Sequence, residues 1–188
     1  MTSIEPVRPG AVTDPELAEL IERGECLGVP GTLFPLILAR VPGYAKALLR
    51  AMLISHTEGS VDHRLKEIIR LQLTRRSGDA YFAGLRSVPA MDGGLNEAVI
   101  TAGCDDYERS TLFTEAEKWA LRYADQMYMN AESVDAEFYA GMKQHYTEAQ
   151  IMELGAFIAL HYGMQVFMRT LGNAGEDERA GDKVARLA

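Results

Sequence analysis

Hydrophobic positions along this chain recur at helical spacing, and no run alternates between apolar and polar residues over the length of a strand. Glycine and proline separate the periodic segments, as they commonly do between helices. The pattern predicts helices at residues 16–23, 33–40, 44–56, 61–76, 79–88, 115–129 and 148–171. We therefore expect an all-α fold, a single-domain helical bundle of about eight helices.

Two of the predicted helices carry a complete start signal. Thr114 with Glu117, and Thr147 with Gln150, have the spacing of a capping box. In such a box each of the two side chains satisfies a backbone N–H group at the start of the helix. We therefore expect helices to begin directly after Thr114 and Thr147.

The whole chain is predicted to be one domain in three parts. The core should span about residues 30–173, where the periodic segments are dense. An N-terminal helical arm, residues 1–29, should precede it. A small, charged C-terminal tail, residues 174–188, should follow it.

The composition is that of a soluble globular protein with an acidic surface. Hydrophobic residues make up 47% of the chain and charged residues 24%, and the formal net charge is -8. Such a surface repels phosphate backbones and anionic lipids, so we expect no nucleic acid and no membrane as partner. The apolar stretch 154–168 is shorter than a membrane-spanning helix requires, and the N-terminus does not read as a signal peptide. The expected location is the cytoplasm.

Metal, cofactor and disulfide signals are missing from the sequence. The two cysteines, Cys26 and Cys104, lie far apart, which favours free thiols in a reducing compartment. The histidines lack metal-ligand spacing, and no phosphate loop, dinucleotide fingerprint or nucleophile elbow occurs. We therefore expect no metal and no cofactor, and a small molecule as the partner.

The helix predicted at residues 61–76 has two different faces. Its core face comprises Leu65, Ile68, Ile69 and Leu73, with Gln72 among them. Its polar face comprises His63, Glu67, Arg70 and Thr74. One interpretation is a solvated stripe of weak surface pairs. The other is a stripe that faces a pocket or a neighbouring subunit, where Glu67 would relay protons.

The segment at residues 61–88, VDHRLKEIIRLQLTRRSGDAYFAGLRSV, resembles the central motif of the alkylhydroperoxidase D/carboxymuconolactone decarboxylase superfamily. In its peroxidase branch a glutamate is followed at fixed spacing by C-x-x-C and then by a histidine. The same spacing places the glutamate at Glu67, the cysteines at Asp79 and Phe82, and the histidine at Arg86. The glutamate is kept, and the redox residues are replaced.

The resemblance extends over most of residues 33–173, including the helix after the motif and the closing helix. It implies the all-helical fold of that superfamily and assembly as a dimer, trimer or hexamer. Thiol peroxidation needs a thiolate and a resolving thiol, which Asp79 and Phe82 cannot supply. Cys104 lies outside the motif, and we expect the two aspartates that follow it to raise the pKa of its thiol.

Polar, chemically competent residues stand where the redox residues would be. The resemblance places Glu67 beside Asp79, where mutual repulsion would raise one pKa toward neutrality, as a general acid or base needs. Arg86, expected on the same helix face as Asp79 and Phe82, would hold a substrate carboxylate, and Tyr81 would donate a proton or a hydrogen bond. The alternative is that Asp79 only caps its helix and Arg86 lies at the surface or in a subunit contact.

The closing helix offers a second candidate, because it is apolar nearly all round and therefore expected to be buried. His161 and Gln165 share one face of it as a polar pair. A lone buried histidine is more often a satisfied core residue, and His56 and His145 have weaker claims still. The predicted catalytic residues are thus Glu67, Asp79 and His161. The predicted substrate-binding residues are Arg86, Tyr81, Phe82 and Gln165.

The favoured function is a cofactor-independent acid/base enzyme of the lyase, decarboxylase or isomerase type. Its substrate would be a small carboxylated or cyclic metabolite, similar to that of the decarboxylase branch. The alternative is a non-catalytic binding or assembly protein with the same fold, in which Asp79 would bond only to its own helix. A thiol peroxidase that depends on Cys104 is less favoured.

Overall fold

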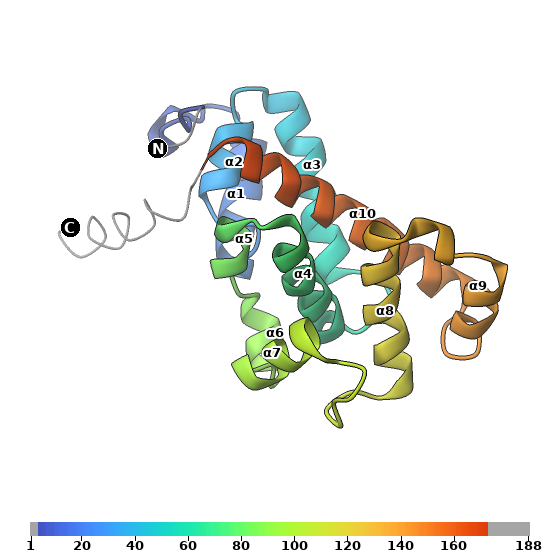
Figure 1. Cartoon of the computed structure of the whole chain (residues 1–188). Coiled ribbons are helices and arrows are strands. Elements are labelled where there is room, and N and C mark those ends of the chain that lie inside the picture. Colours follow the sequence, from blue (N-terminus) through green and yellow to red (C-terminus); the bar gives the residue numbers. More distant parts are fainter. Residues whose placement is uncertain (1–3, 173–188) are drawn as a thin grey trace.

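The computed structural model describes residues 4–172, which form helices and no strand (Figure 1). The α-helices of this range are α1 (Pro15–Leu27), α2 (Leu33–Leu38), α3 (Pro42–Thr57), α4 (His63–Ser77), α5 (Ala80–Gly84), α6 (Val88–Asp92), α7 (Glu97–Asp105), α8 (Glu115–Met129), α9 (Ala136–Met142) and α10 (Glu148–Thr170). Two short 3-10 helices are η1 (Pro9–Ala11) and η2 (Ala131–Ser133). The predicted all-α class is confirmed, with more and shorter helices than expected. The tail predicted at residues 174–188 lies outside the described residues.

Helix α4 occupies the middle of the bundle, packed against α3, α5, α6, α7, α8 and α10 (Figure 1). Every residue from Leu65 to Thr74 is buried, including the polar ones. Glu67 and Arg70 have a relative exposure of 0%. The interpretation of the polar face of this helix as a solvated stripe is therefore wrong. The middle of this helix has no solvent side, so its charged residues there must find partners inside the protein.

Local sequence signals fix most helix ends as expected. Both predicted capping boxes, at Thr114 and at Thr147, are present with reciprocal hydrogen bonds. Asp62 caps α4 by accepting a hydrogen bond from the N–H of Leu65. Gly78 ends the same helix in the left-handed conformation, with φ 66°.

The helix predicted at residues 79–88 is wrong in its length, because two short helices, α5 and α6, replace it. In the link between them Leu85 is extended, and the carbonyl groups of Phe82 and Leu85 accept hydrogen bonds from Arg70. A side chain thus satisfies carbonyl groups that a longer helix would have bonded to its next turn. Arg86 consequently stands on the link and not on a helix face.

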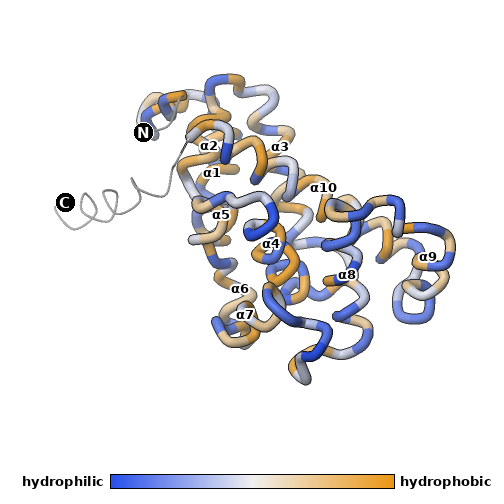
Figure 2. The backbone as a smooth tube through the Cα atoms, in the orientation of Figure 1, coloured by the Kyte–Doolittle hydropathy of each residue, from blue (hydrophilic) through white to orange (hydrophobic). Residues whose placement is uncertain are grey.

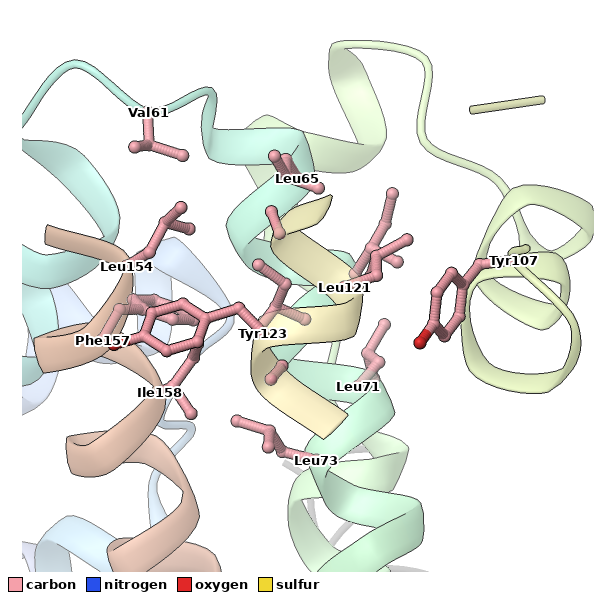
Figure 3. Packing of buried hydrophobic residues seen from close by; sticks show 14 of the residues in the cluster. Val61, Leu65, Leu71, Leu73, Tyr107, Leu121, Tyr123, Leu154, Phe157 and Ile158 are labelled. Atoms are coloured by element: carbon pink, nitrogen blue, oxygen red, sulfur yellow. The ribbon is translucent and has the colours of Figure 1, made fainter. Parts of the chain in front are cut away.

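Three apolar clusters form the core. The largest joins α4, α7, α8 and α10, and Figure 3 shows Leu65, Leu121 and Leu154 converging within it. A second cluster joins α2, α3, α5 and the end of α10, and the third joins α1 to α3. Figure 2 shows apolar and polar residues interleaved along the helices, which is the pattern that predicted them.

By length and composition α10 could cross a membrane, because its 23 residues are mostly apolar. The prediction from the stretch 154–168 alone, that no segment is long enough, does not hold for the whole helix. Within the structure α10 packs against α3, α4, α5 and α8. Helices from protein cores also meet this length and composition test.

Candidate functional site

Glu67 and Arg70 form a fully buried ion pair within α4. Arg70 Nε donates to Glu67 Oε2 and Arg70 Nη2 donates to Glu67 Oε1, each at 2.7 Å. The backbone N–H of Ser87 donates to the same Oε1 at 2.8 Å. A buried carboxylate and a buried guanidinium are tolerated when each satisfies the other in this two-pronged way. The carboxylate of Glu67 therefore has a structural role, because it binds Arg70 and the backbone of Ser87.

The free end of Arg70 holds the segment that follows α4. Arg70 Nη1 donates to the carbonyl oxygen of Phe82 at 2.7 Å, and Nη2 donates to that of Leu85 at 2.8 Å. We call this set, Arg70 with Glu67 and the two carbonyl groups, the Arg70 clamp. The side-chain amide of Gln165 on α10 donates to the backbone carbonyl of Arg70 at 3.0 Å. Gln165 thus ties the closing helix to the clamp.

Asp79 caps α5 by accepting a hydrogen bond from the N–H of Phe82 at 2.7 Å. Burial raises the pKa of Asp79, while that hydrogen bond and the charges of Arg70 and Arg169 lower it. The mutual repulsion expected between Asp79 and Glu67 is not among the causes of this shift. The arrangement is that of a helix cap, as the alternative interpretation of Asp79 had it.

Tyr81 and Phe82 fasten α5 to the start of α2. The Tyr81 hydroxyl donates to the carbonyl oxygen of Pro30 at 2.8 Å and accepts from the N–H groups of Leu33 and Phe34. The ring of Phe82 meets that of Phe34 edge to face at 5.4 Å. Both aromatic side chains are buried in the second core cluster.

Arg86 shares the carbonyl group of Leu85 with Arg70 and pairs with Glu97. Its guanidinium binds Glu97 through two hydrogen bonds, of 2.7 and 3.1 Å, and donates to the carbonyl groups of Ala83 and Leu85. The hydrogen bond with Glu97 raises the pKa of Arg86. The roles predicted for Arg86 and Tyr81 remain predictions, and the structure bonds their polar groups to separate parts of the chain.

His161 lies instead in a cluster of three histidines. Its Nε2 is 2.9 Å from the hydroxyl of Ser55 on α3. The centroid of the His161 ring lies 4.7 Å from that of His56 and 4.2 Å from that of Phe157. Burial holds the pKa of His161 well below its usual range, helped by the charges of nearby cations. His161 is therefore a neutral imidazole at neutral pH, which can accept as well as donate.

His63 links this cluster to the Arg70 clamp. Its Nδ1 lies 2.5 Å from the carbonyl oxygen of His56, and its Nε2 lies 2.6 Å from the hydroxyl of Ser87. Because a carbonyl oxygen only accepts, Nδ1 of His63 carries the hydrogen of this contact. The N–H of Ser87 in turn donates to Glu67. His63 and Ser87 thus connect the backbone of His56 to the buried ion pair.

His56 differs from its neighbours because its ring makes no hydrogen bond. The side chain is buried, with 2% exposure, and neither Nδ1 nor Nε2 has a partner among the described residues. Burial, followed by the charges of Arg70, His63 and Lys66, holds the pKa of His56 well below its usual range. An unsatisfied buried polar group costs about 1–3 kcal/mol. Such a group calls for a specific explanation.

A pocket of about 460 Å³ opens between α3 and α10, beside the histidine cluster. We call it the α3–α10 pocket. It is lined by Ala51, Ile54, Ser55, Glu58, Gly59, Lys66, Glu153, Ala156, Phe157 and Leu160. Ser55 is the residue that joins the two features, because it lines the pocket and contacts His161. Figure 1 shows α3 and α10 side by side along this part of the bundle.

Lys66 and Glu153 supply charge at the wall of the pocket. Lys66 Nζ lies 2.5 Å from Glu153 Oε1 and donates to the carbonyl oxygen of Glu58 at 2.7 Å. Glu153 also accepts from the N–H groups of Ser60 and Val61. Burial opposes the charge of Glu153, but these bonds keep its pKa below the usual range. The side chain of Lys66 is itself 1% exposed.

Comparison with solved structures shows that the chain has a known fold. The chain is similar to the debrominase Bmp8 without ligand, with a TM-score of 0.71 and 19% identity over 88% of this chain and 89% of that one. It is also similar to a cysteine-to-alanine variant of Bmp8 in complex with 2,3,4-tribromopyrrole, with a TM-score of 0.74 and 18% identity over 96% of both chains. The chain has the fold of Bmp8. This fold is the alkylhydroperoxidase D-like fold that the resemblance implied.

Sequence comparison adds no relative to these structures. No protein-family model matches the chain, and no curated protein matches it at a significant level. At 18–19% identity, the similarity to Bmp8 establishes the fold alone. The chemistry has to be inferred from the residues of this chain.

The sequence did not predict a functional role for five residues of the candidate site, namely Ser55, His63, Lys66, Arg70 and Glu153. It gave His56 only a weak claim. Lys66 and Glu153 lie far apart in sequence, and no local pattern links them. The usable signal was the number of polar residues on α4, which a central helix cannot leave unpaired. That signal depends on knowing that α4 is central.

The cysteines of this chain do not take part in the histidine cluster. Burial raises the pKa of the Cys104 thiol, while nearby arginines lower it, so burial is the main cause and not the neighbouring aspartates. A raised pKa leaves less thiolate at neutral pH. Among residues 4–172, no group of three or more histidine, cysteine, aspartate or glutamate side chains is placed to hold a metal ion.

Proposed function

We propose that this protein is a cofactor-independent acid/base enzyme, of the lyase, decarboxylase or isomerase type, acting on a small cyclic or carboxylated molecule in the cytoplasm. The observation that carries the proposal is the contact of Ser55 Oγ with His161 Nε2, at 2.9 Å, in the wall of the α3–α10 pocket. A neutral, buried imidazole bonded to a hydroxyl that reaches a pocket is a common arrangement for proton transfer.

In this proposal His161 exchanges protons with the substrate through Ser55. Burial keeps His161 neutral, so Nε2 can hold either a hydrogen or a lone pair at neutral pH. The Ser55 hydroxyl lies between Nε2 and the pocket, and it transmits a proton in either direction. Glu67 and Asp79 then serve indirectly, because they hold the Arg70 clamp and α5 in place behind the histidines.

The lining of the pocket suits a small ring. Phe157, Leu160 and Ile54 offer apolar surface to a ring. Lys66 is paired with Glu153 and donates to the carbonyl oxygen of Glu58, and its side chain is 1% exposed, so it stabilises the wall of the pocket from behind. The similarity to Bmp8, one structure of which contains a substituted pyrrole, supports a small cyclic molecule as the substrate class.

One observation favours a second candidate, a non-catalytic binding protein. Asp79 accepts its hydrogen bond within its own helix, and Arg86 is paired with Glu97. This is the pattern expected of a scaffold that lost the chemistry of the motif. The two candidates differ in whether a bound molecule is converted.

A ligand screen tests the acid/base proposal. We expect a small ring compound such as benzoate, pyrrole-2-carboxylate or benzamide to raise the melting temperature of the wild type, because a site-binding ligand stabilises the folded state by mass action. The Ser55→Ala variant should lose this shift in part, whereas Ser133→Ala, a serine outside the pocket, should keep it.

Turnover of a bound compound, followed by NMR, then separates the candidates. We expect His161→Gln to lower turnover by about 100-fold or more, as removal of a general acid or base does. Binding without conversion would support the non-catalytic alternative. Equal conversion by the wild type and His161→Gln, or no binding of any compound, would contradict the acid/base proposal.

We also propose that the chain assembles as a homo-oligomer, a dimer, trimer or hexamer, as the resemblance implies. The exposed side chains of Met152, Val166 and Phe167 on α10, with exposures from 37% to 62%, are consistent with a covered surface. Sedimentation velocity measures the assembly directly, and a monomer at micromolar concentration would contradict it.

A further inference from the structure

Helix α10 has one face without any charged residue, and every residue of that face is at least partly exposed. Successive residues of the face lie four and three positions apart, which is the spacing along which two helices pack side by side. A chain with a net charge of -8 meets a second copy most easily where neither surface is charged. We call this surface the α10 face, and it comprises Met152, Ala156, Ala159, Gly163, Val166 and Phe167.

The glycine of the α10 face is not explained by packing within the chain. Gly163 lies in the interior of α10, where glycine is less favourable than alanine. A Cβ atom at Gly163 would meet no atom of the described residues within 4 Å. Gly155 on the same helix differs, because a Cβ atom there would lie 2.8 Å from the hydroxyl oxygen of Tyr123. A second molecule explains the glycine at 163, since a missing side chain lets another backbone approach closely.

The α10 face matches itself when it is turned end for end. Large apolar residues stand at its two ends, and small residues stand in its middle. In two antiparallel copies of α10, related by a twofold axis at Ala159, Met152 would face the partner's Val166. Ala156 would face the partner's Gly163, and Ala159 would face its own copy. A contact between identical surfaces requires such self-complementarity.

We propose that two copies of this chain associate through the α10 face, with their α10 helices antiparallel and a twofold axis at Ala159. The inference rests on the proposed homo-oligomer and specifies its contact. A twofold contact of this kind occurs in a dimer and in a hexamer built from dimers, but not in a trimer. Ala156 belongs both to the α10 face and to the lining of the α3–α10 pocket, so the partner's α10 extends the wall of that pocket.

Cysteine cross-linking tests this arrangement, in a background with Cys26→Ser and Cys104→Ala. After mild oxidation at micromolar concentration we expect Ala159→Cys to give a covalent dimer, because the axis brings both copies of position 159 together. Met152→Cys is the matched control and should give none, because its two copies lie about 21 Å apart along the helices at 1.5 Å per residue. The double variant Met152→Cys/Val166→Cys should cross-link, since each end of α10 meets the other end of its partner.

The outcomes of this experiment separate the arrangement from the assembly. A covalent dimer of Met152→Cys as abundant as that of Ala159→Cys would overturn the antiparallel arrangement. No covalent dimer of Ala159→Cys, in a chain that sediments as a dimer or hexamer, would overturn the inference and leave the proposed assembly standing. A trimer would also overturn the inference, and a monomer would overturn both. None of these measurements depends on turnover, so failure of the acid/base function is seen separately.

A substitution at Gly163 tests the same contact without cysteines. We expect Gly163→Leu to weaken association by about tenfold or more in sedimentation velocity, because a leucine side chain keeps the two backbones apart. The variant should fold like the wild type by circular dichroism, since the space around Gly163 is open within the chain. Gly10→Leu, at a glycine of the N-terminal arm with equally open surroundings, is the control and should leave association unchanged. Equal association of Gly163→Leu and the wild type would contradict the inference.

Discussion

At the scale of single residues, buried charge decides which side chains can react. Glu67 was expected to be a free acid or base, yet two hydrogen bonds from Arg70 and one from the N–H of Ser87 occupy it. The sequence placed Arg70 on the same face of the helix as Glu67 but could not show that this face is buried. His161 was predicted to be a buried polar residue with a catalytic role. Its partner Ser55 could not be predicted, because it lies on α3, far from His161 in sequence.

Breaking the buried pair should cost far more stability than breaking an exposed one. The Glu67→Gln variant would leave the Arg70 guanidinium buried without its counter-charge, and we expect a loss of about 3–5 kcal/mol in the free energy of unfolding. Urea unfolding followed by circular dichroism measures this. The control is Glu97→Gln, which breaks the solvent-exposed pair with Arg86 and should cost less than about 1 kcal/mol. Equal losses in the two variants would show that the Arg70 clamp is not a stabilising element.

At the scale of the elements, local signals predicted helix starts well and helix lengths less well. The capping boxes at Thr114 and Thr147 depend on residues three positions apart, so the sequence contains them in full. The break between α5 and α6 depends on Arg70, which lies on another helix and bonds the carbonyl groups of Phe82 and Leu85. A contact of that kind leaves no local pattern.

One of these capping boxes provides a direct test. We expect Thr147→Ala to lower the free energy of unfolding by about 1 kcal/mol, because the N–H of Gln150 loses its acceptor at the start of α10. Thermal unfolding measures the change. Thr147→Ser, which keeps the hydroxyl, is the control and should restore most of the loss. A loss of the same size in both variants would contradict the assignment.

The loop that leads into α4 depends on a glycine at the rim of the pocket. Gly59 has φ +98°, and a Cβ atom there would meet the carboxylate of Glu153, which also binds Lys66. We expect Gly59→Ala to destabilise the fold by more than about 1 kcal/mol and to weaken ligand binding. Gly94→Ala is the matched control, because Gly94 has φ +94° and open space around it. If both variants lose the same stability, backbone strain alone explains the effect and the contact with Glu153 does not.

At the scale of the whole molecule, the class of fold followed from periodicity, whereas the position of the site did not. Helical spacing and the resemblance to the superfamily both led to the all-α fold, which the comparison with Bmp8 supports. The α3–α10 pocket is formed by helices far apart in sequence, so its lining could not be read from any one of them.

The buried histidines should make the stability of the molecule depend on pH. Burial holds the pKa values of His56 and His161 well below the value of about 6.5 that the unfolded chain has. Below that pH the unfolded chain binds protons that the folded chain does not bind. The free energy of unfolding should therefore fall as the pH drops from 7 toward 5, by up to about 1.4 kcal/mol per pH unit for each histidine.

Urea unfolding at a series of pH values checks this prediction. The His56→Phe variant removes one of the two groups, so we expect a shallower decline over the same range. The His145→Gln variant, at an exposed position, should keep the slope of the wild type. A slope that His56→Phe leaves unchanged would show that other groups cause the acid sensitivity.

The Arg70 clamp also bears on how this chain and a thiol peroxidase could be interconverted. Cysteines placed at positions 79 and 82 would remove the cap of α5 and an aromatic side chain of the core at the same time. The clamp would still hold the carbonyl group of the second position, in a segment where disulfide exchange requires the sulfur atoms to move. Either substitution alone would therefore destabilise the fold before a second thiol was present to form a disulfide.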